Sequence, residues 1–138
     1  MIGLLLVTHG EIGTSLVTSA AQILGAPPAQ VATLSVWRQD DPDDLVLRAR
    51  ELLEGIDAGD GVLVLTDIFG ATPGNVASRL LHDGHVEGVS GVSLPMLLRV
   101  LTSRSASPQI ALGGAVQRAL SGGAEGVVHM NTDRCCDA

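Results

Sequence analysis

Two side chains suited to chemistry each follow an apolar run of the sequence. The apolar run Met1–Val7 is followed by Thr8 and then His9. The apolar run Gly61–Leu65 is followed by Thr66 and then Asp67. An imidazole can act as a nucleophile, a general base or a metal ligand. An aspartate beside it fixes the tautomer of the ring and stabilises positive charge on it. Which role applies depends on where the fold places the two residues.

A turn of small residues separates Asp67 from the next predicted helix. Pro73 suits the first position of that helix, and the residues before it offer backbone N–H groups and one hydroxyl to an anion, of which phosphate is the common case. The pattern therefore predicts that His9 holds or passes a phosphoryl group, with Asp67 orienting the ring. The predicted phosphoryl-binding residues are Gly10, Gly70, Ala71 and Thr72.

This chemistry needs neither a metal nor a cofactor, because helix N-termini can supply the positive field. We therefore expect no cofactor and no metal ligands. The two cysteines, Cys135 and Cys136, are adjacent near the C-terminus. A metal site shared with His129 is the less favoured interpretation of this pair, and a loose tail is the better one.

Apolar runs alternate with amphipathic segments along the chain, which is typical of repeated strand–helix units. We predict an α/β fold: a mostly parallel, doubly wound sheet of about four strands with helices on both faces, plus a short C-terminal strand. If the first and third strands are neighbours, His9 and Asp67 meet at the switch point of the sheet. The predicted strands are Met1–Val7, Val31–Val36, Gly61–Leu65, Glu87–Ser93 and Gly126–Met130.

The predicted helices follow the apolar spacing and the glycine and proline breaks. Gly122 and Gly123 are expected to end the last of them. The predicted helices are Thr14–Leu24, a segment from the acidic loop Gln39–Asp44 to about Ile56, Val76–His82, Pro95–Arg104 and Gln109–Ser121. One domain of residues 1–130 and a tail of residues 131–138 are expected.

Composition narrows the class of partner. Of 138 residues, 46% are hydrophobic, and the formal net charge is −7 with only eight basic residues. Clustered basic residues are what phosphate backbones require, so we expect no nucleic-acid partner. No basic leader precedes the first strand, and no apolar run approaches the roughly 20 residues that span a bilayer. We expect a cytoplasmic protein with no direct membrane insertion.

Three ordered stretches resemble the IIA components of the mannose class of the phosphoenolpyruvate-dependent sugar phosphotransferase system. Leu6–Gly10 resembles the active-histidine motif of that family. Thr66–Asn75 resembles a second motif, in which an aspartate is followed by glycine, a small residue, serine or threonine, proline and, two positions on, asparagine. Gly91–Met96 resembles a third, where a strand enters a helix through Asn/Ser-x-Pro-Met. The likeness extends from about Met1 to Met130.

The resemblance implies a phosphotransferase function. His9 would accept a phosphoryl group from the phosphohistidine of the carrier protein HPr and pass it to a IIB component. Asp67 would hydrogen-bond the ring nitrogen that is not phosphorylated, and Thr72 would lie near the phosphoryl group. Family members form homodimers that exchange a C-terminal strand, a part that Gly126–Met130 would take here.

Alternatives remain open at this point. The family resemblance is compatible with a regulatory module whose partners depend on the phosphorylation of His9, and with a phosphotransfer subunit for dihydroxyacetone phosphorylation. A hydrolase or mutase with a phosphohistidine is less favoured, because such enzymes usually carry an arginine before the His-Gly pair. Thr8 stands at that position.

Overall fold

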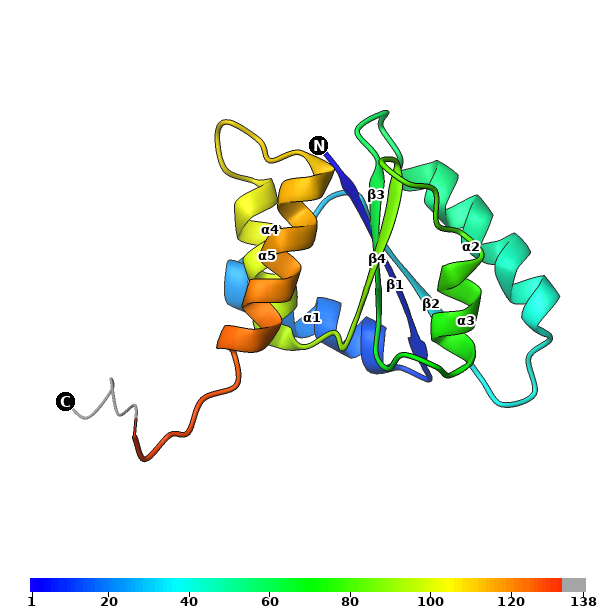
Figure 1. The fold of residues 1–138 in the computed structure, drawn as a ribbon, viewed down its shortest axis with the longest axis horizontal. Helices are drawn as coiled ribbons and strands as arrows, with labels where there is room; N and C mark the ends of the chain where they lie inside the picture. The colour runs from blue at the N-terminus through cyan, green and yellow to red at the C-terminus, as the bar shows by residue number, and fades with distance from the viewer. Residues whose placement is uncertain (133–138) are drawn as a thin grey trace.

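A computed structural model describes residues 1–132 and shows a four-stranded parallel sheet between two layers of helices (Figure 1). The strand order is β2-β1-β3-β4, and every neighbouring pair is parallel. The strand order therefore reverses between β1 and β3, as the doubly wound prediction requires. The strands are β1 Gly3–His9, β2 Val31–Val36, β3 Val62–Thr66 and β4 Val86–Ser90.

Five helices cover the two faces of the sheet (Figure 1). Helices α1, α4 and α5 pack on one face, and α2 and α3 pack on the other. Strands β1 and β3 are buried on both faces, so their side chains alternate between two aliphatic cores. The helices are α1 Ile12–Leu24, α2 Pro42–Ile56, α3 Thr72–Ser78, α4 Leu94–Arg104 and α5 Leu112–Glu125.

The fold class is confirmed, and the strand at residues 31–36 has its predicted bounds. Two other bounds differ in ways that matter for the site. Strand β1 continues to His9 instead of ending at Val7, so the imidazole lies on the last residue of a strand. Helix α3 begins at Thr72, four residues earlier than predicted, because Pro73 occupies its first turn.

Helix α5 runs through the two glycines that were expected to end it. The reason is packing. A Cβ atom at Gly122 would lie 3.0 Å from Cβ of Arg99, and one at Gly123 would lie 2.9 Å from Cε of Met96. The glycines therefore allow α5 to lie close against α4, and helical hydrogen bonding continues to the N–H of Gly126.

The predicted C-terminal strand is absent from the single chain. Within the described residues, Gly126–Met130 forms no regular secondary structure and leads away from the body of the molecule (Figure 1). A strand requires a neighbour for its backbone hydrogen bonds, and among residues 1–132 no backbone hydrogen bond joins this segment to a strand. The cysteines Cys135 and Cys136, and most of the predicted tail, lie outside the described residues.

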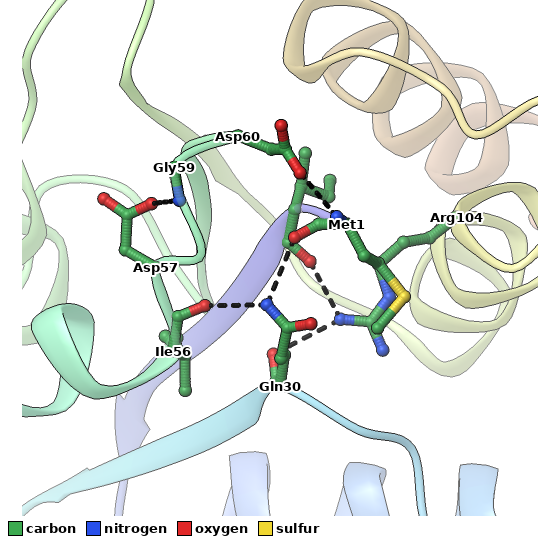
Figure 2. Close-up of polar contacts among 8 residues, drawn as sticks. Met1, Gln30, Ile56, Asp57, Gly59, Asp60 and Arg104 are labelled. Carbon is green, nitrogen blue, oxygen red and sulfur yellow. Dashed lines mark hydrogen bonds and ion pairs between the residues drawn. The ribbon is translucent and has the colours of Figure 1, made fainter.

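The amino ends of the strands are tied together by buried and partly buried polar contacts (Figure 2). The Arg104 guanidinium is buried and donates hydrogen bonds to the carbonyls of Ile2, Ala29 and Gln30. The side-chain amide of Gln30 donates to the carbonyls of Met1 and Ile56, both at 3.1 Å. These bonds join α4, α2 and the starts of β1 and β2 at the end of the sheet opposite His9.

Among residues 1–132, no helix combines the length and the apolar character that crossing a bilayer would require.

Candidate active site at the carboxyl ends of β1 and β3

His9 lies at the carboxyl edge of the sheet, where the chain turns from β1 into α1. Its side chain is 49% exposed, although every earlier residue of β1 is buried. Gly10 follows with φ +48°, a left-handed conformation that glycine adopts at little cost. The turn is held by the buried hydroxyl of Thr8, which accepts a hydrogen bond from the N–H of Gly13 at 2.8 Å.

Asp67 lies directly after β3, the strand that pairs with β1. Its Oδ2 lies 2.8 Å from Nδ1 of His9 and accepts the backbone N–H of His9 at 3.0 Å. Its Oδ1 accepts the N–H of Ile68 at 3.0 Å. The structure thus brings the two predicted residues together across 58 positions of sequence, with the carboxylate held by three hydrogen bonds.

Electrostatics favours the ionised form of this carboxylate. Partial burial raises the pKa of Asp67, but the hydrogen bonds from the His9 ring, the His9 N–H and the Ile68 N–H outweigh it, and the pKa lies below the ordinary value of 3.8. Asp67 is therefore an acceptor near neutral pH. Nδ1 of His9 must then carry the proton that joins them, which leaves Nε2 as the unprotonated nitrogen of a neutral ring.

The turn after Asp67 connects β3 to α3. Gly70 has φ +89°, and Ala71 is the residue that precedes the first helical position of α3. Thr72, the first residue of α3, lines a cleft together with His9. Gly70 and Ala71 do not line that cleft.

The backbone N–H of Gly10 is not available to an anion, and its missing side chain makes room for a neighbouring ring. Its N–H is used in a bond to the carbonyl of Val36 at 2.9 Å. A Cβ atom at Gly10 would lie 3.3 Å from the Trp37 ring, so the indole packs directly against this glycine.

One wall of the cleft was missed by sequence reasoning. Trp37, Arg38 and Asp40 line it, and all three follow β2, the other neighbour of β1. A signal was available: the carboxyl ends of parallel strands share one edge of a sheet, so the residues after Val36 belong beside His9. From the sequence alone, Gln39–Asp44 is expected to open the next helix and to differ with the partner protein, but Trp37 and Arg38 are given no role.

Other polar residues lie away from this site. Arg99 forms an ion pair with Glu125 on the α4–α5 layer. His85 pairs with Asp57, through Nε2 and Oδ2 at 2.6 Å, near the amino ends of the strands. Within residues 1–132, no three histidine, cysteine, aspartate or glutamate side chains are grouped in a way that could hold a metal ion.

Comparison with known proteins assigns this chain to one family. The family model described as the PTS system fructose IIA component matches residues 3–117. The fructose-specific EIIA component of Bacillus subtilis is 31% identical over 105 residues, covering 75% of this chain and 71% of the relative. The chain therefore belongs to the mannose-class family of IIA components of sugar phosphotransferase systems.

Longer relatives and solved structures agree. The mannose-specific EIIAB component of Escherichia coli K12 is 32% identical over 127 residues, which cover 91% of this chain but only 38% of that protein. The phosphotransferase system component EIIA from Streptococcus agalactiae superposes with a TM-score of 0.82 at 26% identity, covering 96% of this chain and 99% of that one.

Proposed function

We propose that this protein is a phosphoryl carrier in which Nε2 of His9 accepts a phosphoryl group from phosphorylated HPr and passes it to a IIB component. The observation that carries the proposal is the 2.8 Å contact between Nδ1 of His9 and Oδ2 of Asp67. It occupies one ring nitrogen and leaves the other, on a half-exposed side chain, free to meet a partner protein.

Asp67 has two roles in this reaction. Before transfer it holds the Nδ1–H tautomer, so the lone pair of Nε2 is directed away from the carboxylate. After transfer the phosphorylated ring keeps its Nδ1 proton and gains positive character, which the Asp67 carboxylate stabilises at the same 2.8 Å. The two further N–H groups bonded to the carboxylate keep it in place during both stages.

Thr72 is the residue of the predicted phosphoryl-binding turn with the strongest support, because it lines the same cleft as His9. Its hydroxyl can donate a hydrogen bond to a phosphoryl oxygen. We propose that Gly70 and Ala71 shape the turn that presents Thr72, and that Gly10 leaves room for the Trp37 ring beside the turn that carries His9.

The test is phosphorylation in a reconstituted chain of carriers. Purified protein is incubated with phosphoenolpyruvate, enzyme I and HPr, and its mass is measured before and after mild acid. We expect an acid-labile gain of about 80 Da, the mass of one phosphoryl group, that is lost in His9→Ala. Unchanged mass in the wild-type protein, or a gain that survives His9→Ala, would contradict the proposal.

A regulatory role is the second candidate. The transcriptional regulatory protein LevR of Bacillus subtilis is 27% identical over 103 residues. These cover 74% of this chain but only 10% of LevR. A related module thus exists inside a transcriptional regulator. We propose that a regulatory function would use the same phosphorylation of His9, and that phosphorylated and unphosphorylated protein would differ in the partners they retain.

We also propose that two copies of the chain form a homodimer through Gly126–Met130. Strand β4 is at the edge of the sheet, and beside it lies a groove lined by Phe69, Leu81, Val116 and Leu120, among others. Val127, Val128 and Met130 are exposed in the single chain. Apolar side chains on a segment with no partner suit an open groove beside an edge strand in a second copy.

Sedimentation tests the dimer. We expect the mass of two chains for the wild-type protein, and a single chain for a variant with aspartate at both Val127 and Val128. A wild-type monomer would refute this proposal and leave the role of His9 unaffected.

A further inference from the structure

Residues of the loop between β2 and α2 line the cleft beside His9. The cleft measures about 490 Å³ and lies between the β2–α2 loop and the start of α3. In the sheet, Val36 pairs with His9, so the loop leaves β2 at the level of the imidazole. The lining residues are His9, Val36, Trp37, Arg38, Asp40, Pro42 and Thr72.

The loop that forms this wall is firmly held. The N–H of Trp37 donates to Oδ2 of Asp40 at 2.8 Å, and the N–H of Asp40 donates back to the carbonyl of Trp37 at 3.0 Å. Asp41 caps α2 by accepting the N–H of Asp43 at 2.9 Å. With the Trp37 ring against Gly10, these bonds fix the loop beside the turn that carries His9.

The loop presents charges of both signs to the cleft, because Asp40 lines it as well as Arg38. Asp40 and Asp41 accept backbone N–H groups, and Asp43 is paired with Arg79. Arg38 is exposed, and it forms no ion pair with any residue from 1 to 132. An unpaired guanidinium therefore lines the His9 cleft of a chain whose net charge is −7.

We propose that Arg38 contacts the phosphoryl group while it moves between His9 and the partner's histidine. This inference rests on the proposed carrier function and adds a residue to it. A guanidinium offers a planar pair of donors that matches two phosphoryl oxygens and neutralises part of their charge. Thr72 adds a neutral hydroxyl to the same cleft, and among the lining residues Arg38 carries the guanidinium.

The transfer step is balanced without any further reactant. The lone pair of Nε2 attacks phosphorus, and the bond from phosphorus to the donor's ring nitrogen breaks. Its electron pair returns to that nitrogen. The proton on Nδ1 of His9 stays in its bond to Asp67. Arg38 remains protonated throughout and binds the equatorial oxygens, where charge is concentrated in the transition state.

The experiment compares Arg38→Gln and Arg38→Lys with Arg48→Gln, which removes the same charge from an exposed position on α2 outside the cleft. Transfer from phosphorylated HPr is followed by rapid quench over a range of donor concentrations. We expect Arg38→Gln to lower kcat about 10- to 100-fold with KM within about twofold, because the contact forms mainly in the transition state. Arg38→Lys should recover part of the rate, and Arg48→Gln should match wild type.

The outcomes separate this inference from the function it rests on. If the wild-type protein shows no His9-dependent phosphorylation, the carrier function and the role of Arg38 both fall. If wild type transfers normally and Arg38→Gln keeps its kcat, only the role of Arg38 is refuted. A rise in KM with unchanged kcat also refutes it, since that result places Arg38 on the docking surface instead of the phosphoryl group. Unchanged thermal unfolding of Arg38→Gln verifies that the variant is folded.

Discussion

The sheet has a histidine–aspartate pair at each end, and the two pairs differ in what they leave free. At the carboxyl end, His9 uses Nδ1 and leaves Nε2 beside a cleft. At the amino end, His85 uses Nε2, its N–H donates to His82 and its carbonyl accepts the N–H of Val62. The second histidine is thus part of the framework at its backbone as well as its ring.

The surroundings of the two pairs also differ: exposed side chains lie near His9, and buried hydrogen bonds lie at the amino end. The exposed side chains of Trp37 and Phe69 lie near the carboxyl ends of the strands, and Trp37 lines the cleft beside His9. The amino end instead contains the buried Arg104 and the bonds of Gln30 that join four segments (Figure 2). A shared pair of residue types therefore does not define a site; the cleft beside His9 and the loops that line it do.

The largest effect should come from the framework end. Replacing Arg104 with leucine removes its three hydrogen bonds to backbone carbonyls and leaves these carbonyls without the charged donor. We expect a loss of about 3–5 kcal/mol in the free energy of unfolding, measured by urea denaturation. The control, Arg48→Leu on the exposed face of α2, should change it by no more than about 0.5 kcal/mol. A loss below 1 kcal/mol for Arg104→Leu would contradict the framework role.

Asp67→Ala should impair phosphoryl transfer and leave the stability of the fold intact. It removes the acceptor of the Nδ1 proton, so we expect phosphoryl transfer to slow about 10- to 100-fold. The protein should stay folded, because Asp67 lies beyond β3 and outside both cores. Circular dichroism and quench kinetics on the same sample decide the matter, and an unfolded variant would make Asp67 a structural residue.

Asp57→Ala is the matched change at the amino end. Asp57 accepts the Gly59 N–H at 2.9 Å and pairs with His85, so its loss should cost about 1–2 kcal/mol of unfolding free energy. Transfer through His9 should remain within about twofold of wild type, as expected for a change outside the reacting site. If Asp57→Ala slows transfer as much as Asp67→Ala does, the two ends are not independent.

The smallest effect is on pH dependence. The hydrogen bond from Gly59 and the contact with His85 outweigh burial and hold the pKa of Asp57 below its ordinary value of 3.8. The unfolded chain then binds more protons in this range, so the stabilisation is complete above about pH 4 and is lost as pH falls through the folded pKa. Acid titration of stability should be shallower below pH 4 for Asp57→Asn than for wild type; parallel curves would argue against this linkage.

Much of the active end was predictable because its signals are local. Apolar runs that end in His9 and near Asp67 identify two strand ends, and the winding of the sheet brings them together. The Trp37–Arg38 wall was missed because nothing in those residues indicates chemistry until β2 is known to adjoin β1. The passage of α5 through Gly122 and Gly123 was missed since close helix packing reverses the usual meaning of glycine.

The amino end was scarcely predictable. Arg104 lies at the end of an amphipathic helix, where an arginine is ordinarily a solvated residue, and its carbonyl partners are more than 70 positions away. Asp57 and His85 are likewise joined only by the folded chain, across 28 positions. Such contacts depend on tertiary proximity, which no pattern of local spacing records.

The most direct test of the difference between the two ends is to locate the phosphoryl group on the ring. The wild-type protein, labelled with ¹⁵N in its histidines, is phosphorylated through HPr and its ring nitrogens are assigned by NMR. The geometry predicts phosphorylation at Nε2 of His9 alone, with a proton retained on Nδ1 and with His85 unchanged. Phosphorylation at Nδ1 of His9, or at His85, would contradict the account.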